Sequence, residues 1–143
     1  MKHNSILFAR SGATVGKAFL YKTDYGRSAF AGYLISALPN DDLLLPGWLM
    51  YYTQSTIYKE WCSYIFSQAT IQNIGADKYA NIPLTLPPIY EQDNIIEYLD
   101  RKCFEIDSLI KSKEKLIEEL TAYRKSLIYE CVTGKKEVPV ESA

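Results

Sequence analysis

The stretch "EQDNIIEYLDRKCFEIDSLIKSKEKLIEELTAYRKSLIYECVTGK", residues 91–135, decides the fold of this chain. It contains no proline, and its first glycine is Gly134, so nothing before that position would break a helix. With Ile96 at heptad position a, nine of the eleven a and d positions are apolar or cysteine. Such a sustained repeat is typical of a coiled coil. The stretch therefore predicts a helix of about 42 residues, roughly 63 Å long, with Gly134 as its C-cap.

The apolar stripe of this helix needs a partner. A domain of about 90 residues cannot cover a rod that long, so the outer part must pack on another helix, from another chain or from a segment outside this sequence. The alternative is a helix folded back on its own domain. Lys113 and Arg124 interrupt the stripe. Polar residues at such positions can fix the register in which two helices pair. We expect dimerisation through Ile96, Leu99, Ile106, Ile110, Ile117, Leu120 and Leu127.

The chain before this helix has a different pattern, and the boundary falls near Pro87 and Pro88. Short runs at 5–10, 17–22, 31–38 and 82–86 predict strands. A helix is predicted over 45–65, with Pro46 in its first turn. Its core-facing stripe would be Leu49, Thr53, Ile57, Trp61 and Tyr64.

The predicted fold class is α+β. A small mixed β-sheet domain with one or two helices, residues 1–88, precedes the long coiled-coil helix, residues 89–134. Residues 135–143 would be a disordered tail.

The segment "RSGATVGKAFLY", residues 10–21, superficially resembles a phosphate-binding loop. Only three residues separate Gly12 from Gly16, however, and Ala18 stands where that motif has a hydroxyl. The residues that follow look like a strand, whereas a phosphate cradle needs a helix N-terminus. A β-hairpin with turn glycines is therefore predicted, and no nucleotide is expected there.

Charge and composition point to a binding protein without metal or cofactor. The formal net charge is −1, but residues 1–90 hold seven Lys/Arg against five Asp/Glu, so any polyanion would bind there. Three widely spaced cysteines and a single histidine make a zinc site or a nucleophile–histidine pair improbable. No apolar run reaches the length of a membrane span, and no signal peptide is recognisable, so a soluble, cytoplasmic protein is expected.

The order of the elements resembles a known family. The hairpin "ILFARSGATVGKAFLY" precedes "PGWLMYYTQS", an amide-rich loop, "IPLTLPPIYEQDNIIEYLD", the heptad helix and "SLIYECVTGKKEV". This order resembles the specificity (S) subunit of type I restriction-modification enzymes, in particular the later part of a target recognition domain with its spacer helix. The most specific piece is I-P-L-x-L-P-P-x-x-E-Q-x-x-I, matched by residues 82–95.

The resemblance implies a non-catalytic DNA-specificity protein. Its domain would read one half-site of double-stranded DNA. Its helix would pair antiparallel with a second copy or another S helix and recruit methyltransferase (M) subunits, and through them the restriction (R) subunit. The chain resembles half of such a subunit, shortened at its N-terminus. The alternative is an assembly-only or regulatory fragment that dimerises without reading DNA.

DNA contacts need Lys and Arg for phosphates, and Arg, Asn and Gln for base edges. The residues of these types, with one threonine, lie around the hairpins and in the amide-rich loop. The candidates are Arg10, Lys17, Lys22, Arg27, Gln68, Thr70, Gln72, Asn73 and Lys78. For each of them the alternative is an ordinary solvated surface residue.

Overall fold

The structure is a computed structural model that describes residues 1–68 and 72–139. The elements in chain order are β1 (Ile6–Ala9), β2 (Ala18–Leu20), the 3₁₀ turn η1 (Thr23–Tyr25), β3 (Leu34–Ala37), α1 (Pro46–Gln54), α2 (Thr56–Ser67), α3 (Ala76–Ala80) and α4 (Ile89–Val132). Two compact units are present. The first, Met1–Tyr98, includes the start of α4, and the second begins at Leu99. The α+β class predicted from the sequence is confirmed.

The sheet has three strands in the order β2-β1-β3. Both pairings are antiparallel, with Leu7 opposite Phe19 in β2 and Ser36 in β3. Where a mixed sheet was expected, the described strands therefore include no parallel pair. Three of the four predicted strands, those at 5–10, 17–22 and 31–38, are confirmed, because each run combines apolar residues with a glycine-bearing or polar turn. Gly12 and Gly16 both have φ of 84°, so the hairpin turn uses the left-handed conformation that glycine adopts without strain.

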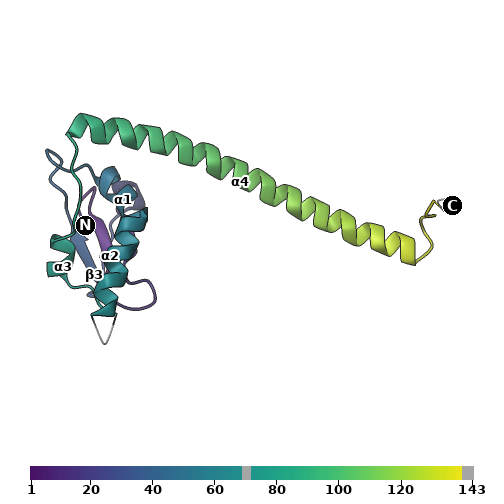
Figure 1. Ribbon diagram of the computed structural model, residues 1–143, viewed down its shortest axis with the longest axis horizontal. Helices are drawn as coiled ribbons and strands as arrows, with labels where there is room; N and C mark the ends of the chain where they lie inside the picture. Colours follow the sequence, from purple (N-terminus) through teal and green to yellow (C-terminus); the bar gives the residue numbers. More distant parts are fainter. Residues whose placement is uncertain (69–71, 140–143) are drawn as a thin grey trace. The chain divides into compact units, whose positions relative to one another are not determined.

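The core lies between β1 and the two helices α1 and α2, which lie together against the sheet (Figure 1). Ile6 and Phe8 are almost fully buried because β1 is the central strand. The ring of Phe8 stacks on that of Tyr79 from α3, with centroids 4.5 Å apart. From α2, Tyr58 and Cys62 complete this cluster.

The single helix predicted over 45–65 is wrong, because it is two helices that meet at Ser55. The Ser55 side chain accepts a hydrogen bond from the Tyr58 N–H at 3.2 Å and so caps α2. Because α2 begins anew after Ser55, its buried face differs from the stripe predicted for one continuous helix. Tyr58 and Cys62 face the core, whereas Ile57 and Tyr64 of the predicted stripe are more than 60% exposed.

The strand predicted over 82–86 is also absent, and this segment is an extended connection instead. Its carbonyls accept hydrogen bonds from side chains rather than from a neighbouring strand. Trp48 donates to Thr85 O at 3.0 Å, and Tyr52 donates to Pro83 O at 2.6 Å. Proline at 83 also removes one N–H that a sheet would need.

The predicted long helix is confirmed as α4, which has 44 residues. It ends at Val132, and Gly134 two residues later has the positive φ of 71° expected of a C-terminal capping glycine. The Lys135 N–H donates to Glu130 O at 2.8 Å, and the Gly134 N–H donates to Cys131 O at 3.2 Å. These two bonds satisfy carbonyls that the last turn leaves open. The predicted disordered tail extends into residues 140–143, which lie outside the described part of the chain, and it stays a prediction.

Two buried tyrosines, Tyr58 and Tyr79, should make the protein less stable at alkaline pH. Burial raises the pKa of Tyr79 to about 12, and burial also raises the pKa of Tyr58. An unfolded tyrosine loses its proton near its ordinary pKa of 10.0. Between these two values the unfolded state releases protons that the folded state keeps, so the free energy of unfolding should fall as the pH rises from 10 to 12. Below pH 10 this contribution is fully present.

We expect Tyr79→Phe to lower stability at neutral pH, because its hydroxyl donates to Ala9 O at 2.8 Å. The same variant should decline less steeply than wild type between pH 10 and 12. Urea unfolding at a series of pH values, followed by tryptophan fluorescence, measures both effects. Tyr64→Phe, at a position 67% exposed, is the matched control and should follow the wild-type curve. Parallel curves for Tyr79→Phe and wild type would contradict this expectation.

Candidate nucleic-acid interface

A hollow of about 470 Å³ lies where the end of α2 meets the segment leading into α3. Three of the predicted DNA-binding residues, Gln68, Asn73 and Lys78, line it together with Tyr64, Ile65, Gly75 and Asp77. We call it the amide hollow. Gln68, Asn73 and Lys78 are all exposed. The hollow thus gathers two amides, one ammonium and one carboxylate on one surface.

The position of Asn73 is fixed by backbone pairing with the end of β1. Ser11 and Asn73 form an isolated antiparallel bridge, and the Ile74 N–H donates to Arg10 O at 2.8 Å. Ile74 itself is fully buried and anchors the segment in the core. The fold therefore brings Arg10 near Asn73, although 62 residues separate them in the sequence. Gln72, next to Asn73, is exposed.

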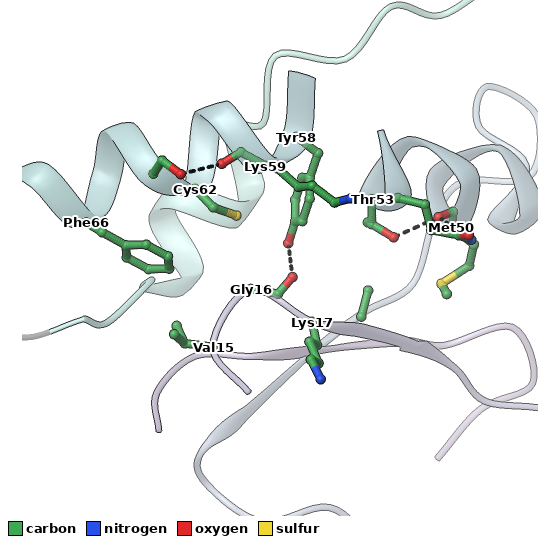
Figure 2. A pocket seen from close by; sticks show the side chains of 12 residues that line it. Val15, Gly16, Lys17, Met50, Thr53, Tyr58, Lys59, Cys62 and Phe66 are labelled. Atoms are coloured by element: carbon green, nitrogen blue, oxygen red, sulfur yellow. Dashed lines mark hydrogen bonds between the residues drawn. The ribbon is translucent and has the colours of Figure 1, made fainter. Parts of the chain in front are cut away.

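Lys17 lies at a second, larger hollow of about 690 Å³, between the hairpin turn, α1 and α2. Figure 2 shows the Tyr58 side chain reaching across this hollow to the Gly16 carbonyl, to which its hydroxyl donates at 2.6 Å. Lys17 points away from α2 (Figure 2). A Cβ on Gly16 would lie 3.2 Å from Cys62 Sγ, so the turn also packs closely on α2. We call this space the hairpin hollow.

The hairpin hollow is not a phosphate cradle of the P-loop type. The residues after Gly16 form strand β2, and no helix begins there. Burial raises the pKa of the Cys62 thiol, which keeps it protonated and therefore weakly nucleophilic. The turn interpretation of the two glycines is confirmed by their positive φ angles.

The remaining candidates lie elsewhere. Lys22 is exposed just before η1, and Arg27 lines a third hollow with Met1, Tyr21 and Ser28. Thr70 lies outside the described residues. The predicted DNA-binding residues are therefore not one cluster. Gln68, Asn73 and Lys78 are brought together, with Arg10 nearby, while Lys17 and Arg27 line separate hollows.

The apolar stripe of α4 is largely solvent-exposed in this chain. The exposed fractions are 55% for Ile106, 49% for Ile110, 63% for Ile117 and 56% for Leu120. Leu99 and Leu127 are half-buried. Ile96 differs from the others, because it lies close to Gly47. A Cβ added to Gly47 would lie only 3.2 Å from Ile96 Cδ1. Ile96 therefore packs on α1 of its own chain.

Among residues 1–68 and 72–139, no group of three histidine, cysteine or carboxylate side chains could hold a metal ion. His3 lies at the surface, and its Nδ1 accepts a hydrogen bond from the Thr23 N–H at 3.3 Å. None of the helices within residues 1–68 and 72–139 combines the length and the hydropathy that a membrane span requires.

Sequence reasoning missed several side chains whose hydrogen bonds hold the globular unit together. Tyr58 and Tyr79 bind carbonyls of the hairpin, and Gln92 binds the connection before α4. The richness in tyrosine, twelve residues, was the available signal, since buried hydroxyls need partners.

Fold and surface together define a small α+β module whose polar side chains gather in open hollows and which carries a long heptad helix. A sequence model of the type I restriction modification DNA specificity domain matches residues 1–122. The chain belongs to this family.

Two relatives are specificity subunits of type I restriction enzymes. That of EcoKI from Escherichia coli (strain K12) is 28% identical over 104 residues, which are 73% of this chain and 22% of the relative. That of StySPI from Salmonella potsdam is 27% identical over 103 residues, which are 72% of this chain and 22% of the relative. The chain thus spans about a fifth of the length of these curated relatives. No solved structure matches the chain.

Proposed function

We propose that this chain is a non-catalytic DNA-specificity module of a type I restriction-modification enzyme, acting in the cytoplasm. Its globular unit reads a half-site of double-stranded DNA. Helix α4 pairs with a second copy or another S helix and with methyltransferase subunits, which link it indirectly to the restriction subunit. The observation that carries the DNA-reading role is the gathering of Gln68, Asn73 and Lys78 in the amide hollow.

The chemistry of the amide hollow suits base edges. An amide side chain offers one acceptor and two donors, which match adenine in the major groove, and lysine serves guanine or a phosphate. The Arg10 carbonyl accepts from the N–H of Ile74, the neighbour of Asn73, and we assign the Arg10 guanidinium to the same DNA-facing surface. Lys17, Lys22 and Arg27 lie apart from it, and we assign them to phosphate contacts, which position a protein without reading sequence.

A second function, assembly without DNA reading, is favoured by a different observation. The exposed stripe of α4 offers a pairing surface that does not depend on the globular unit. The weak positive charge of residues 1–90 would also limit DNA affinity. The two functions separate in a mobility-shift experiment with and without the methyltransferase subunit of the same system.

We expect the chain alone to bind duplex DNA weakly and with strong salt dependence, because few phosphates are neutralised. With the methyltransferase subunit, binding should become sequence-selective. Asn73→Ala should cost about 1–3 kcal/mol in discrimination at one base position. Lys22→Ala should weaken binding equally for all sequences and reduce the salt slope by about 1.

Asn94→Ala is the matched control, an exposed asparagine on α4 away from the hollow. It should leave both affinity and selectivity unchanged. Non-selective binding by the assembled wild-type protein would instead support the assembly-only function.

A further inference from the structure

Gln92 is a polar side chain with no exposed surface, in the first turn of α4. Its amide oxygen and both of its amide hydrogens take part in hydrogen bonds. Its Oε1 accepts from the Leu45 N–H at 2.9 Å. Its Nε2 donates to Leu43 O at 2.9 Å and to Pro87 O at 2.8 Å. One side chain thus ties three segments together: the loop before α1, the connection before α4, and α4 itself.

The contacts around Gln92 extend this attachment. Trp48 and Tyr52 of α1 donate to carbonyls of the same connection, at Thr85 and Pro83. One turn along α4, Ile96 packs on Gly47, where a Cβ would come within 3.2 Å of it. Every one of these groups belongs to the compact unit Met1–Tyr98. Hydrogen bonds from one turn of α4 to the loop before α1, and packing of the next turn on Gly47 of α1, therefore hold the start of α4 in place.

We propose that Gln92 is a positioning residue that fixes the start of α4 on the globular body, with residues 82–96 forming a rigid joint. Packing alone would specify this attachment poorly, since apolar contacts are non-directional. Three hydrogen bonds to carbonyl and N–H groups of separate segments define one geometry. In the proposed DNA-specificity assembly, on which this consequence rests, the joint would contribute to the spacing between two half-sites.

The joint can be tested without DNA, so its failure and that of the proposed function are distinguishable. Nitroxide labels are attached at Glu60→Cys in α2 and Asn94→Cys in α4, both exposed positions, in a Cys103→Ser and Cys131→Ser background. Cys62 is buried and is retained. Labelled chains are diluted with unlabelled protein, and the distribution of label-to-label distances is measured by pulsed electron paramagnetic resonance.

Three variants of the full chain are compared with wild type. Gln92→Met keeps the length of the side chain but removes all three hydrogen bonds. Gln92→Glu keeps the acceptor for Leu45 and loses both donors while ionised, and when protonated it regains one donor. Gln72→Met is the matched control at an exposed glutamine outside the joint.

We expect a single narrow distance distribution for wild type and Gln72→Met. Gln92→Met should broaden the distribution at least two-fold or split it, at temperatures where tryptophan fluorescence shows the core still folded. Gln92→Glu should be broad at pH 8 and narrow towards the wild-type width as the pH is lowered to 5. This pH-dependent rescue is not expected from a side chain that only fills space.

A narrow distribution for Gln92→Met would overturn the proposal, even if its melting temperature falls, because Gln92 would then stabilise without positioning. A broad wild-type distribution would overturn it as well. If Gln92→Met fails to fold, the proposal is tested instead by the width of the distance distribution of Gln92→Glu between pH 5 and 8. A distribution that stays broad from pH 8 down to pH 5, where the protonated carboxyl regains a donor, would contradict the positioning role.

Discussion

The double variant Ile110→Asp/Leu120→Asp should sediment as a monomer at tens of micromolar, where the wild-type chain should sediment as a dimer. Both side chains lie on the stripe of α4, and each is about half exposed in the single chain. Burying an aliphatic side chain is worth about 1.5–3 kcal/mol. Ile96 packs on its own chain, so the other six residues predicted for the stripe would together supply roughly 9–18 kcal/mol before association costs. Two aspartates in such a seam would bury unpaired charges.

The matched control places the same two charges on the opposite face of α4. Ser108→Asp and Ala122→Asp are exposed positions away from the stripe and should leave the dimer intact. Sedimentation velocity across a concentration series measures the dissociation constant of each protein. A wild-type monomer at tens of micromolar would show that α4 does not pair with itself. A dimer that survives the double substitution would show that pairing uses another surface.

The second large effect is expected in the core of the globular unit. Phe8→Ala should lower the free energy of unfolding by about 3–5 kcal/mol, because the side chain lies on the central strand and is 1% exposed. Its ring also stacks on Tyr79, a contact that would be lost. A loss of this size is a large part of the stability of a typical small domain.

Tryptophan fluorescence during urea unfolding isolates this effect, since both tryptophans, Trp48 and Trp61, lie in α1 and α2. Phe30→Ala removes the same ring from a position 44% exposed and is the matched control. It should cost less than about 1 kcal/mol, as is usual for surface substitutions. Equal losses for the two variants would mean that β1 is not the centre of the core.

The helix α4 was predictable because one periodic signal runs through its whole length. Its apolar residues repeat without a breaker, and Gly134 ends it with the conformation that glycine favours. The hairpin was predictable for a similar reason, since its turn glycines lie between two short apolar runs. In α4 and in the hairpin, the local sequence preference and the tertiary structure favour the same backbone conformation.

The break at Ser55 and the missing strand at 82–86 show where local reasoning failed. Apolar spacing runs across Ser55, and only its capping bond to Tyr58 reveals that a new helix begins there. The segment 82–86 has the composition of a strand. Its carbonyls are bound by Trp48 and Tyr52, more than 30 residues earlier, and no local pattern predicts such contacts.

The candidate site was predictable in residue type but not in arrangement. Residue type predicts Gln68, Asn73 and Lys78 as polar residues of one loop, and the fold brings them together because Ile74 pairs with the end of β1. The same rule predicts Lys17 and Arg27, which line separate hollows. Gln92 was missed. Extending the heptads backward from Ile96 places it at position d, where a polar residue signals a specific partner.

Selection of DNA from a random duplex pool, by the chain mixed with the methyltransferase subunit that we propose as its partner, tests the central claim most directly. We predict that wild type enriches a defined half-site motif. A variant carrying Gln68→Ala, Asn73→Ala and Lys78→Ala should lose or relax that motif while still assembling with the methyltransferase subunit. Enrichment of no motif by wild type, or of the same motif by the triple variant, would contradict the claim that the amide hollow reads DNA.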